Sequence, residues 1–237
     1  MESIGQNLER VRQRMADAAL RAGRDPLSLR LVAVTKTVPP ERMLEAISSG
    51  ADLLGENRVQ EAMEKAPAVR QALESSNAGT AVPRWHLIGH LQRNKVRHVF
   101  GLFEAVHSVD SLRLIEALET RAASRDEHMR VFVEVNAAGE EGKNGCRPEE
   151  AEGLAAAAER SPHLTLEGLM TMPPFTRDPE DSRPWFRKLR ELRDRLADAG
   201  RGGLRELSMG MTADFEVAIE EGATVVRVGS AIFGPRT

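Results

Sequence analysis

The sequence has no tyrosine, a single cysteine and an aromatic content of only 4%. One cysteine, Cys146, excludes an intrachain disulfide and a zinc site built from cysteines. No apolar run approaches the ~18 residues that span a bilayer, and the first ten residues lack the basic and apolar regions of a signal peptide. The 33 basic and 36 acidic residues give a net charge of −3, so no strong field attracts nucleic acid or an acidic membrane. We therefore expect a cytoplasmic protein that binds neither nucleic acid nor membrane.

The rest of the composition is that of a folded globular chain. Apolar residues make up 41% and charged residues 29% of the 237 positions. This length often holds one α/β barrel, and no linker divides it. We expect one domain over residues 1–237.

Short apolar runs alternate with helical patterns along the whole chain. The N-terminal residues from Ile4 onward have helical spacing, and Ser3 and Gln6 match a capping box. The expected strands are Leu29–Thr35, Ala51–Gly55, Arg84–Gly89, Glu104–Ser108, Val131–Asn136, Thr165–Thr171, Leu204–Met209 and Thr224–Gly229. The expected helices between them are Pro40–Ser49, Glu56–Ala72, Leu91–Phe100, Asp110–Ser124, Arg147–Glu159, Ser182–Ala199 and Thr212–Glu221.

Eight such strand–helix units predict a (β/α)8 TIM barrel, an α/β fold, with an extra N-terminal helix. An open doubly wound sheet is the alternative. That fold favours a glycine-rich turn after its first strand, whereas residues 35–39 read Thr-Lys-Thr-Val-Pro.

Two glycine- and serine-containing loops follow the last two expected strands. They are Ser208-Met209-Gly210 and Gly229-Ser230-Ala231. Barrels often bind phosphate in these loops, because glycine lets backbone N–H groups approach phosphate oxygens closely. The loops predict a phosphate site, with ordinary turns capped by serine as the alternative.

Lys36 directly follows the clearest expected strand, so its side chain is expected at the barrel mouth. Burial and neighbouring cations there would favour the neutral amine, which can form a Schiff base with a carbonyl compound. An exposed surface lysine is the plainer interpretation. Together with a phosphate site, Lys36 points either to a sugar phosphate, as in a lysine aldolase, or to pyridoxal phosphate.

Arg227 lies two residues before Gly229, so strand alternation puts both on one face, toward one ligand. If that ligand is pyridoxal phosphate, a permanently charged arginine at the pyridine nitrogen keeps the ring a weak electron sink. An ion pair with an interior carboxylate such as Glu134 is the structural alternative.

Other polar residues give weaker signals. His86 and His90 straddle a strand end and do not share a helical face as zinc ligands would, and Cys146 has no adjacent base. His107 and Asp110 suggest acid–base work, although Asp110 also fits a helix N-cap.

Long blocks of this sequence resemble those of the pyridoxal phosphate homeostasis proteins, a family similar to the barrel domain of alanine racemase. The blocks are AVTK, GENRVQE, WHLIGHLQRNK, GLMTM, LSMGMTADFEVAI and VRVGSAIFG. The resemblance covers nearly the whole chain. It implies a barrel of PLP fold type III that holds pyridoxal 5'-phosphate (PLP) as an internal aldimine on Lys36.

The resemblance also implies roles for further residues. Ser208, Gly229 and Ser230 are expected to contact the phosphate, and Arg227 the pyridine ring. The expected lining of the site is Asn57, His86, Met170 and Met209. Lys143 is expected to be a second contact for the cofactor during its transfer. The chain departs from the family pattern at Arg58, His90 and Ser230, where many members have tyrosine, proline and threonine.

The sequence favours a carrier of PLP over an enzyme. Racemisation needs an acid or base on each face of the substrate carbon, and Lys36 supplies only one. In alanine racemase, the second acid or base is a tyrosine from a separate domain. We expect neither that tyrosine nor that domain here. The expected function is PLP homeostasis, with delivery to apo-enzymes that depend on PLP. The alternatives are a racemase of low activity and, more remotely, a cofactor-free aldolase. We expect a monomer or weak homodimer and no metal.

Overall fold

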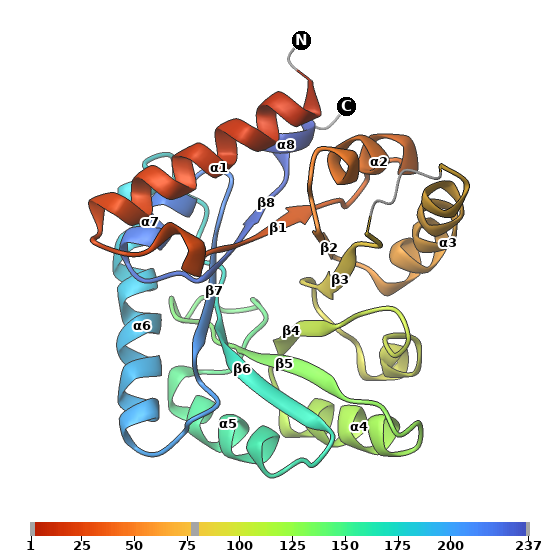
Figure 1. The fold of residues 1–237 in the computed structure, drawn as a ribbon. Helices are drawn as coiled ribbons and strands as arrows, with labels where there is room; N and C mark the ends of the chain where they lie inside the picture. Colours follow the sequence, from red (N-terminus) through yellow and green to blue (C-terminus); the bar gives the residue numbers. More distant parts are fainter. Residues whose placement is uncertain (1–2, 77–80, 236–237) are drawn as a thin grey trace.

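The computed structural model describes residues 3–76 and 81–235 and shows a closed, fully parallel barrel of eight strands in sequence order (Figure 1). Each strand pairs with the next in the chain, and β1 pairs with β8 to close the ring. This confirms the predicted (β/α)8 barrel. The strands are β1 (Arg30–Val34), β2 (Leu53–Glu56), β3 (Arg84–Leu87), β4 (Ala105–Val109), β5 (Met129–Glu134), β6 (Leu164–Met170), β7 (Glu206–Met211) and β8 (Val225–Val228).

Helices surround the barrel and follow the predicted pattern closely. One prediction differs, because the expected helix over residues 91–100 is a 3-10 helix over Arg93–His98. The helices are α1 (Ile4–Arg21), α2 (Pro40–Ser48), α3 (Val59–Ser75), α4 (Leu112–Ala123), α5 (Ala151–Glu159), α6 (Arg183–Asp198), α7 (Phe215–Glu220) and α8 (Ser230–Phe233). Within the described residues, no helix is long and apolar enough to cross a membrane.

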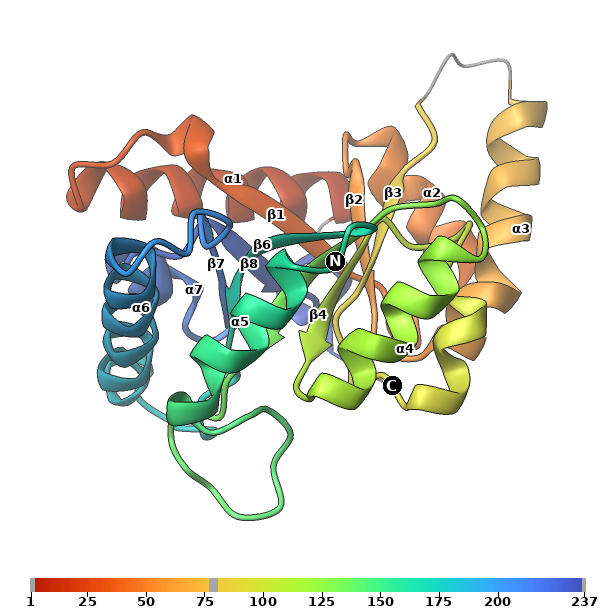
Figure 2. The same cartoon turned by 90° about the horizontal axis from the view of Figure 1, so that it is seen from below.

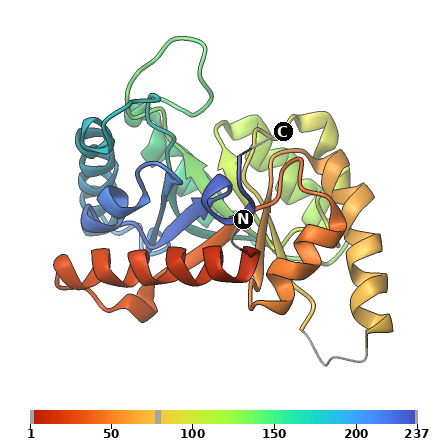
Figure 3. The ribbon, with the colours of Figure 1, turned by 90° about the horizontal axis from the view of Figure 1, so that it is seen from above.

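The extra N-terminal helix α1 lies along the outside of the barrel against α7, α8 and α2 (Figure 3). Its predicted capping box is present, with reciprocal bonds between Ser3 and Gln6. Arg14 makes a two-point contact with Glu216 and lies over the ring of Phe215. These contacts fix α1 beside the elements that carry the end of the chain.

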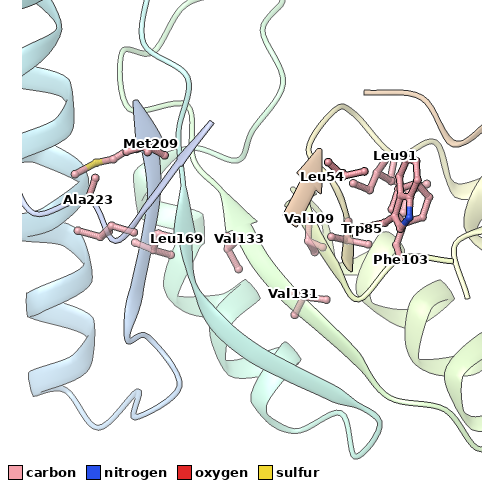
Figure 4. Packing of buried hydrophobic residues seen from close by; sticks show 14 of the residues in the cluster. Leu54, Trp85, Leu91, Phe103, Val109, Val131, Val133, Leu169, Met209 and Ala223 are labelled. Carbon is pink, nitrogen blue, oxygen red and sulfur yellow. The ribbon is translucent and has the colours of Figure 1, made fainter. Parts of the chain in front are cut away.

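Strand alternation divides the apolar side chains into two layers. A small cluster that includes Val34, Phe132 and Met170 fills the barrel interior. A much larger cluster fills the space between the strands and the helices, and Figure 4 shows part of it around Leu169 and Trp85. The inner layer is therefore small and leaves room for polar side chains inside the barrel.

Ion pairs join the strands where they begin, at the end of the barrel opposite the expected site. They alternate in sign around this end, and several of the partners are half-buried. The pairs are Arg84 with Asp52 and Glu104, Arg130 with Glu104 and Glu167, and Arg30 with Glu167 and Glu206. These ion pairs occupy the end of the barrel where the strands begin, and the loops at the other end are left for binding.

The loop between β5 and α5 projects away from the body of the barrel (Figure 2). Asn136 shapes its start, since the side-chain amide donates to the Glu140 carbonyl and its oxygen accepts from the Gly139 and Glu140 N–H groups. Lys143 lies on this loop and pairs with Glu140. The loop thereby carries a lysine beyond the barrel mouth.

Candidate functional site

Lys36 lines a cavity of about 290 Å³ at the carboxyl ends of β1 and β8. Gly229 and Ser230, from the loop after β8, line the same cavity. Arg42 at the start of α2 also borders it and donates to the Phe233 carbonyl. The structure thus brings the predicted reactive lysine and one of the two predicted phosphate loops to one small cavity, close to the ~300 Å³ lower range of ligand pockets.

A hydroxyl that follows β7 contacts the backbone of the loop after β8. Thr212 Oγ1 accepts hydrogen bonds from the backbone N–H groups of Gly229, at 3.3 Å, and Ala231, at 3.5 Å. Both bonds are long, so the two N–H groups remain suited to a stronger, charged acceptor. Backbone donors and a hydroxyl together form a site for an anion such as phosphate.

Below the mouth, a chain of buried polar side chains crosses the barrel interior. Arg227 donates to Ser208 Oγ at 2.6 Å and to the Thr171 carbonyl at 2.9 Å. Ser208 Oγ bonds His107 Nδ1 at 2.8 Å, and His107 Nε2 bonds His86 Nδ1 at 2.8 Å. All of these side chains are buried, and His86 Nε2 has no hydrogen-bond partner within the described part of the chain. The chain of bonds holds the Arg227 guanidinium in one orientation inside the barrel.

Burial sets the charges along these side chains. It lowers the pKa of His86 to about 3 and the pKa of His107 well below its usual range, so both imidazoles are neutral near pH 7. Burial also lowers the pKa of Arg227 to about 10, against the opposing effect of Glu134, and the guanidinium stays charged. Burial raises the pKa of Glu134 itself to about 7. Arg227 therefore places a fixed positive charge close to neutral histidines.

The neutral state of His86 predicts a pH effect on stability. The unfolded chain binds a proton at this histidine below about pH 6.5, whereas the folded protein binds it only near pH 3. Stability from this site is complete above pH 6.5 and falls with pH below it, by up to about 1.4 kcal/mol per pH unit. Urea unfolding from pH 6.5 to 4 should show a shallower fall for His86→Gln than for the wild type. Equal slopes would mean that the folded protein protonates His86.

The ion pair between Arg227 and Glu134, the alternative to a ligand contact, is absent among the described residues, since the Arg227 bonds go to Ser208 and Thr171. The predicted pairing of His107 with Asp110 is absent there as well. His107 lies inside the barrel, whereas Asp110 faces His90 at 3.6 Å near the surface. β4 ends at Val109, so Asp110 lies beyond the strand that carries His107.

The predicted site lining is placed in different parts of the barrel. Met170 lies in the inner apolar cluster. Met209 does not face the interior, which corrects the prediction: it packs outside the strands near Leu169 and Ala223 (Figure 4), because Ser208 takes the inward position beside it. Asn57 borders another cavity, of about 370 Å³, at the ends of β2 and β3.

Lys143 lines a further cavity of about 390 Å³. Glu134, Met172, Met211 and Asp214 line it as well, and Lys36 does not. The two lysines singled out in the sequence therefore serve different cavities at the same end of the barrel.

Thr212, and not the expected Ser208, lies next to the loop of Gly229. Ser208 is fully buried and its hydroxyl is engaged by Arg227 and His107, whereas Thr212 lies beside Gly229. In the sequence, Thr212 stands out only as the start of an expected helix. Its position four residues after Ser208, one past Met211 at the end of β7, is the signal that could have identified it.

Comparisons with known proteins agree on the fold and the family. The chain matches the family model of the alanine racemase N-terminal domain over residues 2–237. It is 44% identical over 232 residues to a protein of Aquifex aeolicus named pyridoxal phosphate homeostasis protein, covering 98% of this chain and 97% of that one.

Two solved structures are similar over almost their whole length. The structure of an unknown protein from Bifidobacterium adolescentis has a TM-score of 0.89 and 40% identity, with 97% of this chain and 94% of that one covered. PipY of Synechococcus elongatus, solved with PLP bound, has a TM-score of 0.79 and 31% identity, with 98% and 100% covered.

Proposed function

The chain belongs to the pyridoxal phosphate homeostasis protein family, and we propose that it binds PLP at the mouth of its barrel and maintains the supply of this cofactor. One observation supports this above all: Lys36 and the loop of Gly229 and Ser230 line the same small cavity. PLP carries an aldehyde, which a lysine amine can bond covalently, and a phosphate, which backbone N–H groups bind. The cavity offers both partners to one molecule.

In this proposal, the neutral amine of Lys36 would condense with the aldehyde to a Schiff base, and the aldehyde oxygen would leave as water. The N–H groups of Gly229 and Ala231 and the Thr212 hydroxyl receive the phosphate, in the place where the two N–H groups now share Thr212 Oγ1. Ser230 adds its hydroxyl or its backbone N–H from the same loop. Ser208 does not contact the phosphate in this proposal; its hydroxyl accepts a hydrogen bond from Arg227 and orients that side chain.

Arg227 is proposed to meet the pyridine nitrogen of the cofactor. Its guanidinium stays charged, since its pKa is lowered only to about 10, and its bonds to Ser208 and Thr171 hold it in place. A fixed cation keeps that nitrogen unprotonated and weakens the ring as an electron sink. The residue therefore favours holding the cofactor over carbanion chemistry.

We infer a carrier without racemase activity, and the geometry of the histidines supports this. The chain has no tyrosine, so a second acid or base has to come from another residue. His86 and His107 are neutral, buried and bonded to each other. The test is exchange of the α-proton of amino acids in deuterated buffer by PLP-loaded protein. No exchange above free PLP supports the carrier, exchange with any amino acid overturns it, and inversion of that amino acid establishes the racemase instead.

The phosphate site predicts an effect of Thr212→Val. This change keeps the shape of the side chain but removes the hydroxyl beside Gly229, and we expect PLP to bind about tenfold more weakly, the loss of one charge-assisted hydrogen bond. Pyridoxal, which lacks the phosphate, should bind both proteins equally. Equal PLP affinity of the two proteins, measured by spectroscopic titration, would place the phosphate elsewhere.

Delivery of PLP to apo-enzymes and a role for Lys143 in that transfer are part of the proposal. Lys143 lies on the projecting β5–α5 loop, half-exposed, where an approaching protein can reach it (Figure 2). Asn57 at its own cavity is proposed to approach the cofactor from the β2 side. The cytoplasmic location and a monomer or weak homodimer stay predictions.

A further inference from the structure

Lys36 lies in a tight turn after β1, and the residues on either side of it, Thr35 and Thr37, are held by contacts from outside the barrel wall. The Val38 N–H donates to the Thr35 carbonyl at 2.9 Å, so Lys36 and Thr37 are the central residues of a β-turn. Thr37 has a φ of +62°. A β-branched residue rarely adopts this left-handed conformation, which costs free energy unless other contacts hold it.

Three charged residues outside the barrel wall contact this turn. We call Glu56, Glu61 and Lys65 the turn clamp. Lys65 Nζ donates to the Thr35 carbonyl at 2.8 Å and pairs with both clamp carboxylates. Its side chain is only 11% exposed and that of Glu56 is fully buried, so this cluster is built into the fold.

Each residue beside Lys36 has its own contact with the clamp. The Thr35 hydroxyl donates to Glu56 Oε1 at 2.7 Å. The Thr37 N–H donates to Glu61 Oε1 at 2.5 Å. Lys65 joins the two carboxylates, because Glu61 and Lys65 lie one turn apart on α3. The backbone on both sides of Lys36 is therefore tied to one ion-paired unit.

We propose that the turn clamp positions Lys36 for bonding to the aldehyde by holding Thr37 in its left-handed conformation. This inference rests on the proposed function, because it assumes that Lys36 is the residue that bonds to PLP. A reacting amine has to approach a carbonyl carbon within a narrow range of positions. A turn that relaxed at Thr37 would move the Lys36 side chain out of line with the phosphate loop. The clamp residues are positioning residues and do not touch the cofactor.

The test measures how fast the absorption band of the lysine–PLP bond appears after mixing protein with PLP. Glu61→Ala removes the acceptor of the Thr37 N–H, and we expect a rate about tenfold lower, the factor for loss of one charge-assisted hydrogen bond. Glu61→Gln keeps a neutral acceptor, so its rate should lie between the rates of Glu61→Ala and the wild type. Thr37→Gly in the Glu61→Ala background should restore the rate to within about twofold, because glycine adopts positive φ without support.

Glu64→Ala is the matched control. Glu64 is exposed on the same helix, and its side chain has no hydrogen bond or ion pair within the described part of the chain. Its variant should react at the wild-type rate. Thermal unfolding of each variant shows whether it is folded, and the rescue by Thr37→Gly distinguishes positioning from a general loss of structure.

Two results would overturn the inference. One is a wild-type rate in Glu61→Ala, and the other is a slow Glu61→Ala protein that Thr37→Gly does not rescue. Failure of the proposed function looks different: the wild-type protein itself would then show no band, or Lys36→Ala would keep it.

Discussion

Lys36→Ala protein mixed with PLP is expected to show no absorption band of a lysine–PLP bond, whereas the wild-type protein shows one. The side chain of Lys36 is the amine that lines the cavity with Gly229 and Ser230, and alanine cannot bond to an aldehyde. The effect is all or none, because a covalent bond is lost. An absorption spectrum of each purified protein, before and after addition of PLP, measures it.

Lys143→Ala is the control for this result. Lys143 lies on the projecting loop and lines another cavity, so its variant should keep the band. A band that survives Lys36→Ala and disappears with Lys143→Ala would move the covalent site to the loop. If the wild type shows no band even with added PLP, the alternative of a cofactor-free aldolase that uses Lys36 is favoured instead.

Gly168→Ala is expected to destabilise the protein strongly, although it adds only one methyl group. Gly168 pairs with Glu206 where β6 meets β7, and a Cβ atom at this position would overlap the Glu206 carbonyl oxygen. Backbone cannot yield as a flexible side chain does, so the two strands would have to separate. We expect a loss of about 3 kcal/mol or more in the free energy of unfolding.

Gly153→Ala tests the same substitution where space is open. Gly153 lies in helix α5, and nothing in the described part of the chain lies within 4 Å of the added Cβ. Alanine in a helix is favoured over glycine by up to about 1 kcal/mol, so this variant should be more stable than the wild type. Urea unfolding of Gly168→Ala and Gly153→Ala measures both changes in the free energy of unfolding. A stable Gly168→Ala protein would contradict the close approach of β6 and β7.

The barrel could be predicted because its signals are local. Short apolar runs alternate with helical patterns along the chain, and some strands, such as β1, are nearly continuously apolar, as expected when helices cover one face and the barrel interior the other. Lys36 could be placed for the same reason, since a residue directly after a clear strand lies at the mouth. The α-helix expected over residues 91–100 is wrong, because the short basic segment Arg93–His98 forms a 3-10 helix instead.

The interior of the site could not be predicted, because it depends on strands that are far apart in the sequence. His107 and Ser208 are 101 residues apart and share a hydrogen bond across the barrel. Whether a strand residue faces inward also depends on register, which assigns Ser208 to the interior and Met209 to the helices. Lys65 gave no signal in the sequence, since a lysine within a helix is ordinarily on the surface.

Borohydride reduction of PLP-loaded wild-type protein, followed by peptide mass mapping, locates the covalent bond itself. The reducing agent converts a Schiff base to a stable amine, so the cofactor stays on the residue that held it. The cavity of Lys36, Gly229 and Ser230 predicts that the modified peptide contains Lys36. Modification of Lys143 or Lys65 with an unmodified Lys36, or a protein that retains no cofactor after reduction, would contradict the proposal.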